Sequence, residues 1–217
     1  CEILKKDFYK EKNNNNLILG GAQLGLKYGM LEKKFTINEA NSLIKHALKK
    51  NITCIDTASS YGESEKNIGL ATVNIKKNKI RIISKLDHIK PSNSLKDIER
   101  MVDESIHKTL SNLGLKKIDT LLLHQVNNLN IKNGFIWKKL LNLKKKKLIK
   151  NLGISVQNTN ELLIALDTEH VKVIQLPFNI IDNRWNKFIK KITDANVIKN
   201  IEIHIRSCFL QGVLLSQ

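Results

Sequence analysis

Short apolar runs rich in β-branched residues recur along the chain, separated by longer segments of mixed polarity. A short, continuously apolar run is the pattern of a strand buried on both faces of a parallel sheet. The sequence predicts seven such strands: Leu17–Gly20, Thr53–Ile55, Ile80–Ser84, Thr120–Leu123, Asn151–Ile154, Val173–Leu176 and Ile201–Ile205.

Most segments between these runs carry the three- and four-residue periodicity of amphipathic helices. Thr36 and Glu39 have the spacing of a capping box, which predicts a helix that begins there and ends at Asn51. A second clear pattern covers Leu95–Leu113, with Gly114 at the position of a C-cap glycine. Weaker patterns predict helices over Phe135–Lys147, Asn158–Leu166 and Trp185–Val197.

Seven strands alternating with six helices predict parallel strands joined by right-handed crossovers, in a barrel or an open doubly wound sheet. The open dinucleotide-binding sheet predicts a GxGxxG turn after the first strand, and the sequence of Gly20–Gly25 does not match it. We therefore predict one α/β domain over residues 1–217, a (β/α)₈ TIM barrel truncated after strand seven, with residues 1–16 as an N-terminal extension.

The length of 217 residues is low for this fold, since a complete barrel typically needs roughly 250 residues. The sequence ends with Phe209–Gln217 soon after the seventh predicted strand, so the eighth βα unit is absent from it. Cys1 stands where an initiator methionine is expected, which leaves open a fragment or a naturally shortened protein. A barrel short of one strand exposes two sheet edges, which predicts self-association through those edges.

The net charge of +17 arises from 37 basic and 20 acidic residues, a balance that can indicate nucleic-acid or anionic-membrane binding. Recognition of phosphates and bases favours arginine, however, and runs such as Asn13–Asn16 and Lys144–Lys147 are typical of solvated loops and helix faces. We therefore expect no nucleic-acid partner. A general attraction for phosphorylated ligands stays open. The sequence has only four arginines: Arg81, Arg100, Arg184 and Arg206.

Cysteine use and hydropathy indicate the compartment. Cys1, Cys54 and Cys208 are odd in number and lack metal-ligand spacing, which argues against a disulfide framework and a zinc site. No stretch approaches the ~20 apolar residues of a membrane span, and the charged N-terminus lacks a signal-peptide core. We expect a soluble cytoplasmic protein with no metal and no membrane partner.

Four chemically complementary side chains stand at or just past the C-terminal ends of three successive predicted strands: Asp56, Tyr61, Lys85 and His124. In a parallel barrel these strand ends open onto one face, so the four side chains can converge. Singly, each has an ordinary explanation, such as a helix cap for Asp56 or a surface charge for Lys85. Together they indicate a site for carbonyl reduction.

Three segments, in their order and spacing, resemble the aldo/keto reductase family: Asp56–Glu65, Ile83–Lys85 and Leu122–His124. The likeness covers residues 17–217 and continues through Gly20–Gly25, Gly153–Ser155, Gln175–Asn179 and Ser207–Gly212. The resemblance implies a (β/α)₈ barrel that reduces aldehydes and ketones with NADPH, less often NADH, and without a metal.

The roles expected of the four residues follow from what hydride transfer requires. Hydride that arrives at a carbonyl carbon leaves negative charge on the oxygen, so a proton donor and a nearby positive charge lower the barrier. Tyr61 would be the general acid, and the Lys85 ammonium would make its phenol a better donor. Asp56 would keep the buried Lys85 charged, and His124 would donate a hydrogen bond that orients the substrate oxygen.

The resemblance also implies cofactor contacts at the ends of later strands. Ser155 and Gln175 match positions that hold the carboxamide of nicotinamide, although Val156 replaces the customary asparagine. The family's contacts to adenosine mostly follow strand eight, so the sequence does not distinguish NADPH from NADH. The expected cofactor-binding residues are Gly21, Gln23, Ser155, Gln175, Arg206, Ser207, Phe209, Gln211 and Gly212, the last five in a phosphate-binding loop.

Two functions follow from this resemblance. The leading one is NAD(P)H-dependent reduction of a small aldehyde or ketone, with a lean toward a sugar-derived carbonyl because family members with a similar opening motif act in bacterial sugar and surface-polysaccharide metabolism. The alternative is a catalytically inactive or truncated regulatory module that binds nicotinamide nucleotide. Turnover distinguishes the two.

Overall fold

The computed structural model describes residues 16–30, 34–75, 79–90, 92 and 94–215. The predicted N-terminal extension, apart from its last residue, lies outside the described residues. The described strands form one parallel sheet in which each strand pairs with the next along the chain. They are β1 (Ile18–Gly20), β2 (Cys54–Asp56), β3 (Arg81–Lys85), β4 (Ile118–Leu123), β5 (Ile149–Ser155), β6 (Val173–Pro177) and β7 (Glu202–Arg206).

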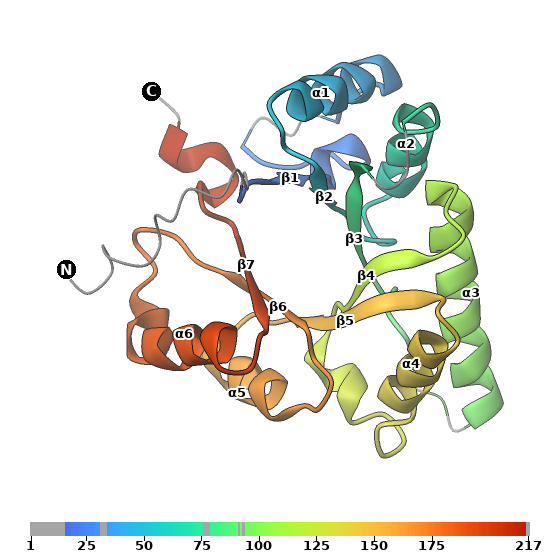
Figure 1. Ribbon diagram of the computed structural model, residues 1–217, viewed down its shortest axis with the longest axis vertical. Coiled ribbons are helices and arrows are strands. Elements are labelled where there is room, and N and C mark those ends of the chain that lie inside the picture. The colour runs from blue at the N-terminus through green and yellow to red at the C-terminus, as the bar shows by residue number, and fades with distance from the viewer. Residues whose placement is uncertain (1–15, 31–33, 76–78, 91, 93, 216–217) are drawn as a thin grey trace.

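The sheet curls into an incomplete ring with the helices around its outside (Figure 1). The α-helices of the described chain are α1 (Ile37–Lys49), α2 (Ser64–Ala71), α3 (Leu95–Leu113), α4 (Phe135–Lys145), α5 (Thr159–Asp167) and α6 (Ile189–Val197). This arrangement confirms the predicted (β/α)₈ type of fold that stops after its seventh strand. Within the described residues, no helix combines the length and apolarity needed to cross a lipid bilayer.

Helix ends follow the local sequence where a cap was predicted. The Thr36 side chain accepts from the backbone N–H of Glu39, whose carboxylate in turn accepts from the Thr36 N–H, so the capping box forms at the start of α1. Gly114 ends α3 in the left-handed conformation with φ of 59°. Both predictions are confirmed, because capping and positive φ depend on a few neighbouring residues.

Two predicted helices were wrong at one end. Helix α4 ends at Lys145 and not Lys147, because Lys147 adopts a left-handed backbone with φ of 63° that an α-helix cannot continue. Helix α6 begins at Ile189, after the 3₁₀ segment η4 (Asn183–Phe188). Trp185 is completely buried in η4 and its indole N–H donates to Asp182, so tertiary contacts of the indole fix this turn.

Several strands end one residue later than the apolar pattern predicts, at Asp56, Lys85, Ser155, Pro177 and Arg206. In β2, β5 and β7 the pattern stops at the last hydrophobic residue, whereas the strand continues into a polar one. Asp56 pairs with Gly20 of β1, and Ser155 pairs with Gln175 of β6. The polar side chains at the strand ends are therefore held by the sheet itself.

The main hydrophobic core lies between the sheet and the helices outside it. Its largest cluster packs sheet residues such as Leu121 and Ile154 against Val102 of α3 and Leu140 of α4. A much smaller cluster centres on Ile83, Leu122 and Val173, which share the other face of the strands. This leaves room for polar side chains inside the barrel.

An ion pair spans the barrel interior near the N-terminal ends of the strands. Arg81 Nη1 of β3 lies 2.7 Å from Glu202 Oε2 of β7, and Arg81 Nε lies 3.2 Å from Asp119 Oδ1 of β4. His204 Nε2 lies 3.1 Å from the same Glu202 oxygen. Because β3 and β7 are not neighbours in the sheet, the Arg81–Glu202 pair directly links two strands that β4, β5 and β6 separate along the sheet.

Candidate active site

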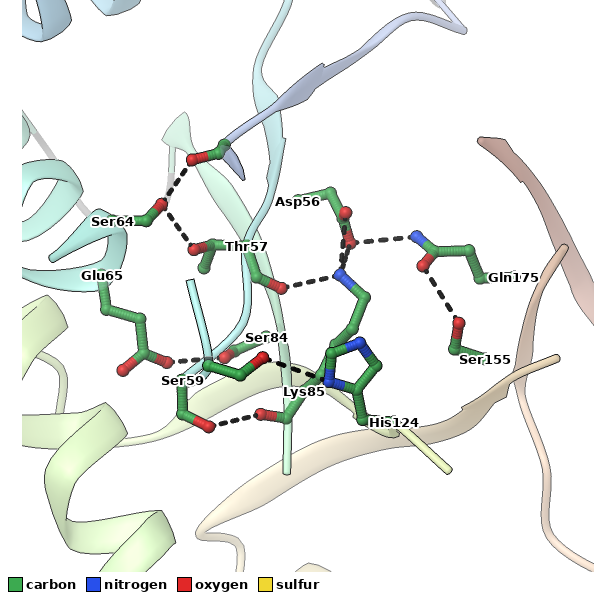
Figure 2. Close-up of polar contacts among 12 residues, drawn as sticks. Asp56, Thr57, Ser59, Ser64, Glu65, Ser84, Lys85, His124, Ser155 and Gln175 are labelled. Carbon is green, nitrogen blue, oxygen red and sulfur yellow. Dashed lines mark hydrogen bonds and ion pairs between the residues drawn. The ribbon is translucent and has the colours of Figure 1, made fainter. Parts of the chain in front are cut away.

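The Lys85 ammonium lies at the centre of the polar cluster at the C-terminal ends of the strands (Figure 2). The side chain is 1% exposed, and Nζ lies 2.8 Å from both carboxylate oxygens of Asp56 and 2.8 Å from the carbonyl oxygen of Thr57. An ammonium has three N–H groups, so these oxygens use all of them. A buried cation is stable only with such compensation, which the aspartate at the end of β2 provides.

Asp56 also connects this ion pair to β5 and β6. Gln175 Nε2 donates to Asp56 Oδ1 at 3.0 Å, and Ser155 Oγ donates to Gln175 Oε1 at 3.4 Å (Figure 2). Ser155 and Gln175 are both buried and end neighbouring strands. The two residues expected to hold the nicotinamide carboxamide therefore adjoin the Asp56–Lys85 pair.

Tyr61 and His124 complete the group around the ammonium. Lys85 Nζ lies 5.0 Å from the centre of the Tyr61 ring, and the Tyr61 ring meets the His124 ring edge-on at 6.0 Å between centroids. The N–H groups of Lys85 are engaged by Asp56 and Thr57, so the ammonium lies near the Tyr61 ring without donating a hydrogen bond to it. The structure thus brings together all four residues that the sequence singled out.

His124 is an uncharged ring at neutral pH. Burial, with a further contribution from the Lys85 charge, lowers the pKa of His124 to about 4. Ser60 Oγ lies 3.3 Å from His124 Nδ1. When Nδ1 accepts the Ser60 hydroxyl proton, Nε2 carries the remaining hydrogen and can donate it to a ligand.

The loop that carries Tyr61 is fixed by close packing against the loop after β1. A Cβ added at Gly25 would overlap the Tyr61 carbonyl oxygen and the Ser64 backbone nitrogen. Gly62, directly after Tyr61, has φ of 57° and lies against the Gly25 carbonyl oxygen. These contacts require glycine at both positions, because any side chain would push the two loops apart.

Gly21 takes part in this same packing, and Gln23 is bonded within the loop after β1. The Gly21 N–H donates to the Asp56 carbonyl oxygen at 2.7 Å, and its own carbonyl oxygen accepts from Ser64 Oγ at 2.7 Å. Gln23 Nε2 donates to the Tyr28 carbonyl oxygen at 2.8 Å. Both predicted cofactor residues therefore stand beside the site with these groups engaged by protein.

The predicted phosphate-binding loop follows β7. It contains three non-glycine residues with left-handed backbone, Ser207, Leu210 and Gln211, and then Gly212 with φ of 102°. Such strained conformations persist where the surroundings hold them, and the Gln211 carbonyl oxygen accepts from the Met30 N–H at 3.1 Å. Phe209 is exposed. The loop is thus fastened to the loop after β1.

The shorter hydrogen bonds of Arg206 go to residues outside its predicted group. Its Nη2 donates to Gln157 Oε1 at 2.6 Å and to the Val156 carbonyl oxygen at 3.2 Å, both just past β5. Sequence reasoning missed Gln157, which lies two residues past the predicted serine Ser155. Its position after a strand end was the available signal.

Two further supports of the site lacked a sequence signal. The Thr57 carbonyl oxygen on Lys85 is a backbone group whose use depends on tertiary structure. Glu65 of α2 is buried and accepts from Ser84 Oγ at 2.6 Å and Thr109 Oγ1 at 2.9 Å. Glu65 thereby joins α2 and α3 to the strand residue that precedes Lys85.

The fold and this polar cluster together define a parallel βα-barrel protein with an ion pair, a tyrosine and a histidine at its C-terminal face. The chain belongs to the aldo/keto reductase family, whose sequence model matches residues 16–217. A curated relative, D-arabinose 1-dehydrogenase of Saccharomyces cerevisiae, is 32% identical over 146 residues. The match covers 64% of this chain and 42% of that protein, so the chain spans less than half of the relative's length.

Solved structures share the fold at lower sequence identity. A putative aldo-keto reductase from Pseudomonas aeruginosa superposes with a TM-score of 0.70 at 24% identity, over 88% of this chain and 71% of that one. The holo form of an aldo-keto reductase from Bacillus halodurans gives 0.73 at 20% identity, over 92% and 64%. A Bombyx mori aldo-keto reductase in complex with NADP gives 0.65 at 18% identity, over 88% and 62%.

Proposed function

We propose that this protein reduces the carbonyl group of a small aldehyde or ketone to an alcohol, with a nicotinamide nucleotide as hydride donor and Tyr61 as general acid. The observation that carries the proposal is the buried Lys85–Asp56 pair beside the Tyr61 ring. Membership of the aldo/keto reductase family supports the same chemistry.

In the proposed mechanism, a nicotinamide nucleotide held beside Ser155 and Gln175 would supply the hydride that the carbonyl carbon accepts. Tyr61 donates its phenolic proton to the carbonyl oxygen, and the Lys85 ammonium stabilises the phenolate that this leaves. Asp56 keeps Lys85 charged inside the barrel. His124, uncharged at neutral pH, donates a hydrogen bond that holds the carbonyl oxygen near Tyr61.

The residues at the strand ends fit a nicotinamide group. Ser155 and Gln175 offer a hydroxyl and an amide, which suit a carboxamide, and their mutual hydrogen bond is long at 3.4 Å. A Cβ added at Gly20, opposite Asp56 in the sheet, would meet nothing within 4 Å, so there is space beside the ion pair. We propose that NADPH or NADH occupies this space.

The other expected cofactor residues support this arrangement in two ways. The loop of Ser207, Phe209, Gln211 and Gly212 would wrap the phosphates, while Gly21 and Gln23 shape the neighbouring loop. The curated relative is named a D-arabinose 1-dehydrogenase, which favours a sugar-derived carbonyl as substrate.

Tyr61→Phe tests the proposal, because it removes the proton donor and leaves the ring. We expect NADPH-dependent reduction of aldehydes to fall by at least about 100-fold, while the nicotinamide fluorescence titration still shows binding. Tyr28→Phe is the matched control, since Tyr28 is not part of the Lys85 cluster, and its turnover should equal that of the unaltered chain. Undiminished turnover in Tyr61→Phe would exclude Tyr61 as the acid.

The regulatory-module alternative predicts a different result for the unaltered chain. It would bind NADPH or NADH and reduce no carbonyl compound in a broad screen. Absence of cofactor binding by the folded chain would contradict both functions.

A further inference from the structure

Arg206 is a half-buried cation without an acidic partner at the same face as the proposed active site. No carboxylate of the described residues lies within ion-pair distance of its guanidinium, and its closest contacts are the neutral oxygens of Gln157, Val156 and Ser207. Burial accordingly lowers the pKa of Arg206, and the Arg206 charge in turn helps to lower the pKa of His124. A desolvated positive charge of this kind is stabilised by a bound anion.

The hydrogen bonds of Arg206 leave part of its guanidinium unused. The guanidinium has five N–H groups, and those on Nη2 go to Gln157 Oε1 and the Val156 carbonyl oxygen. Nη1 reaches Ser207 Oγ only at 3.5 Å. The Nε–H and a second Nη1–H have no acceptor within the described part of the chain.

Gln157 connects this charge to a cavity. An arginine can only donate hydrogen bonds, so Arg206 fixes Gln157 with its amide oxygen toward the guanidinium and its NH₂ group turned away. Gln157 lines a cavity of about 350 Å³ together with His124, Gln125, Val126, Asn127 and Glu161. The volume suits a small ligand, and His124 places the cavity beside the proposed carbonyl position.

The side-chain oxygens of Glu161 and Gln125 in the cavity wall are engaged by protein groups. Glu161 is the acidic residue of the lining, and its two oxygens accept from the Gln157 backbone N–H at 2.7 Å and from Asn158 Nδ2 at 3.1 Å. Gln125 Oε1 lies 2.7 Å from His88 Nδ1. The NH₂ group of Gln157 is therefore a hydrogen-bond donor, and the Arg206 guanidinium is bonded to the oxygen of the same amide.

We propose that Arg206 and Gln157 form a subsite for an anionic group of the carbonyl substrate, so that a substrate carrying a carboxylate is preferred over its neutral counterpart. This inference rests on the proposed reductase function and deepens it by naming the substrate class. The net charge of +17 adds a general attraction for such substrates.

Two pairs of substrates that differ by a carboxylate test the proposal: D-glucuronate with D-glucose, and succinic semialdehyde with butanal. We expect kcat/KM to favour the acid by about tenfold or more in at least one pair, the size of a charge-assisted hydrogen bond. Arg206→Gln should abolish most of this ratio, and Arg206→Lys should retain part of it because the charge remains. Gln157→Leu should also lower it.

Lys187→Gln is the matched control, since it removes one exposed positive charge of η4 and should leave the ratio as it is. An unaltered chain that shows no preference for the acid in either pair overturns the proposal. The proposal is also overturned if the ratio of kcat/KM for the acid to kcat/KM for the neutral substrate is the same in Arg206→Gln as in Lys187→Gln.

The cofactor's phosphates are the other source of an anion for Arg206. The fluorescence titration gives the fold-increase in the Kd for NADPH that Arg206→Gln causes. If this increase exceeds the fold-decrease in the kcat/KM ratio of acid to neutral substrate, the anion belongs to the cofactor and the proposal is overturned.

A chain that reduces none of the four substrates would contradict the proposed function, and a binding readout then decides the subsite separately. Succinate should raise the Tm of the unaltered chain more than 1,4-butanediol does, and this difference should disappear in Arg206→Gln. The subsite is overturned if the two ligands raise the Tm of the unaltered chain equally. It is also overturned if the difference between the ligands is the same in Arg206→Gln.

Discussion

At the scale of single residues, Lys85 has the most demanding environment of the site. Its ammonium is almost fully buried, yet each of its N–H groups meets an oxygen 2.8 Å away. Removing one partner of such a pair leaves an uncompensated charge in the interior, which costs far more than removing a surface pair.

Asp56→Asn should therefore destabilise the fold as well as the site. We expect the free energy of unfolding to fall by about 3 kcal/mol in urea titrations, because Lys85 loses its counter-charge. Asp103→Asn is a suitable control, since it removes one carboxylate from the more exposed pair with Lys139 and should cost less than about 1 kcal/mol. Equal losses in the two variants would mean that the buried pair is not special.

His124 should remain uncharged throughout the physiological range. Its pKa is lowered to about 4 by burial and by the Lys85 charge, whereas the unfolded chain takes up the proton near the ordinary value of 6.5. The unfolded state therefore binds more protons between these values, and the contribution of His124 to stability is lost as the pH falls from 6.5 toward 4. Proton NMR should find no titration of the His124 ring between about pH 5 and 8, with His124→Gln used to assign the signal. A midpoint near 6.5 would contradict the burial argument.

At the scale of elements, the loops after β1 and β2 depend on each other. Gly25 and Gly62 allow the two backbones to meet, and Gly21 donates to the Asp56 carbonyl oxygen at the end of β2. The position of Tyr61 is thus fixed by a neighbouring loop and not only by its own segment.

Substitution of two glycines of the β1 region separates close packing from general glycine effects. Gly25→Ala should lower the free energy of unfolding by about 3 kcal/mol, the upper end for overpacking, because the added Cβ overlaps backbone atoms that cannot turn away. Gly20→Ala should leave the Tm nearly unchanged, since its Cβ would meet nothing within 4 Å. Thermal unfolding of both variants tests the difference, and similar Tm values would contradict it.

At the scale of the whole molecule, polar contacts cross the interior of an incomplete barrel. β1 and β7 each pair with only one strand in the described sheet, and Ile205 of β7 is 44% exposed. The Arg81–Glu202 ion pair links β7 to β3 across the interior. Self-association through the strand edges stays a prediction.

Glu202→Gln measures how much the Arg81–Glu202 ion pair contributes to the free energy of unfolding. The pKa of Glu202 is lowered from 4.5 to about 2, chiefly by the His204 hydrogen bond and also by Arg81, so its stabilising effect is present above pH 4.5 and is lost as the pH falls toward 2. The variant should be less stable than the unaltered chain at neutral pH, and the difference should shrink at about pH 3. Glu169→Gln, an exposed carboxylate, is the control. A difference that does not change with pH would contradict the ionic origin of the effect.

Much of the fold could be predicted because its signals are local. The capping box at Thr36, the left-handed Gly114 and the apolar runs each depend on a few adjacent residues. The two caps appear as predicted, and each apolar run overlaps a strand whose ends differ from the prediction by at most two residues. The end of α4 was missed because Lys147 adopts a left-handed backbone that no glycine signals. The start of α6 was missed because Trp185 packs into the core, where tertiary contacts outweigh helix periodicity.

The sequence by itself determined the alternation of strands and helices, and the parallel barrel then brought Asp56, Tyr61, Lys85 and His124 to one face, because strand ends of one direction meet there. Only the tertiary structure decided how these groups are paired. It showed that Lys85 donates its N–H groups to Asp56 and the Thr57 carbonyl oxygen, and that Arg206 donates to Gln157. Burial and hydrogen-bond direction depend on residues distant in sequence, and no local pattern specifies them.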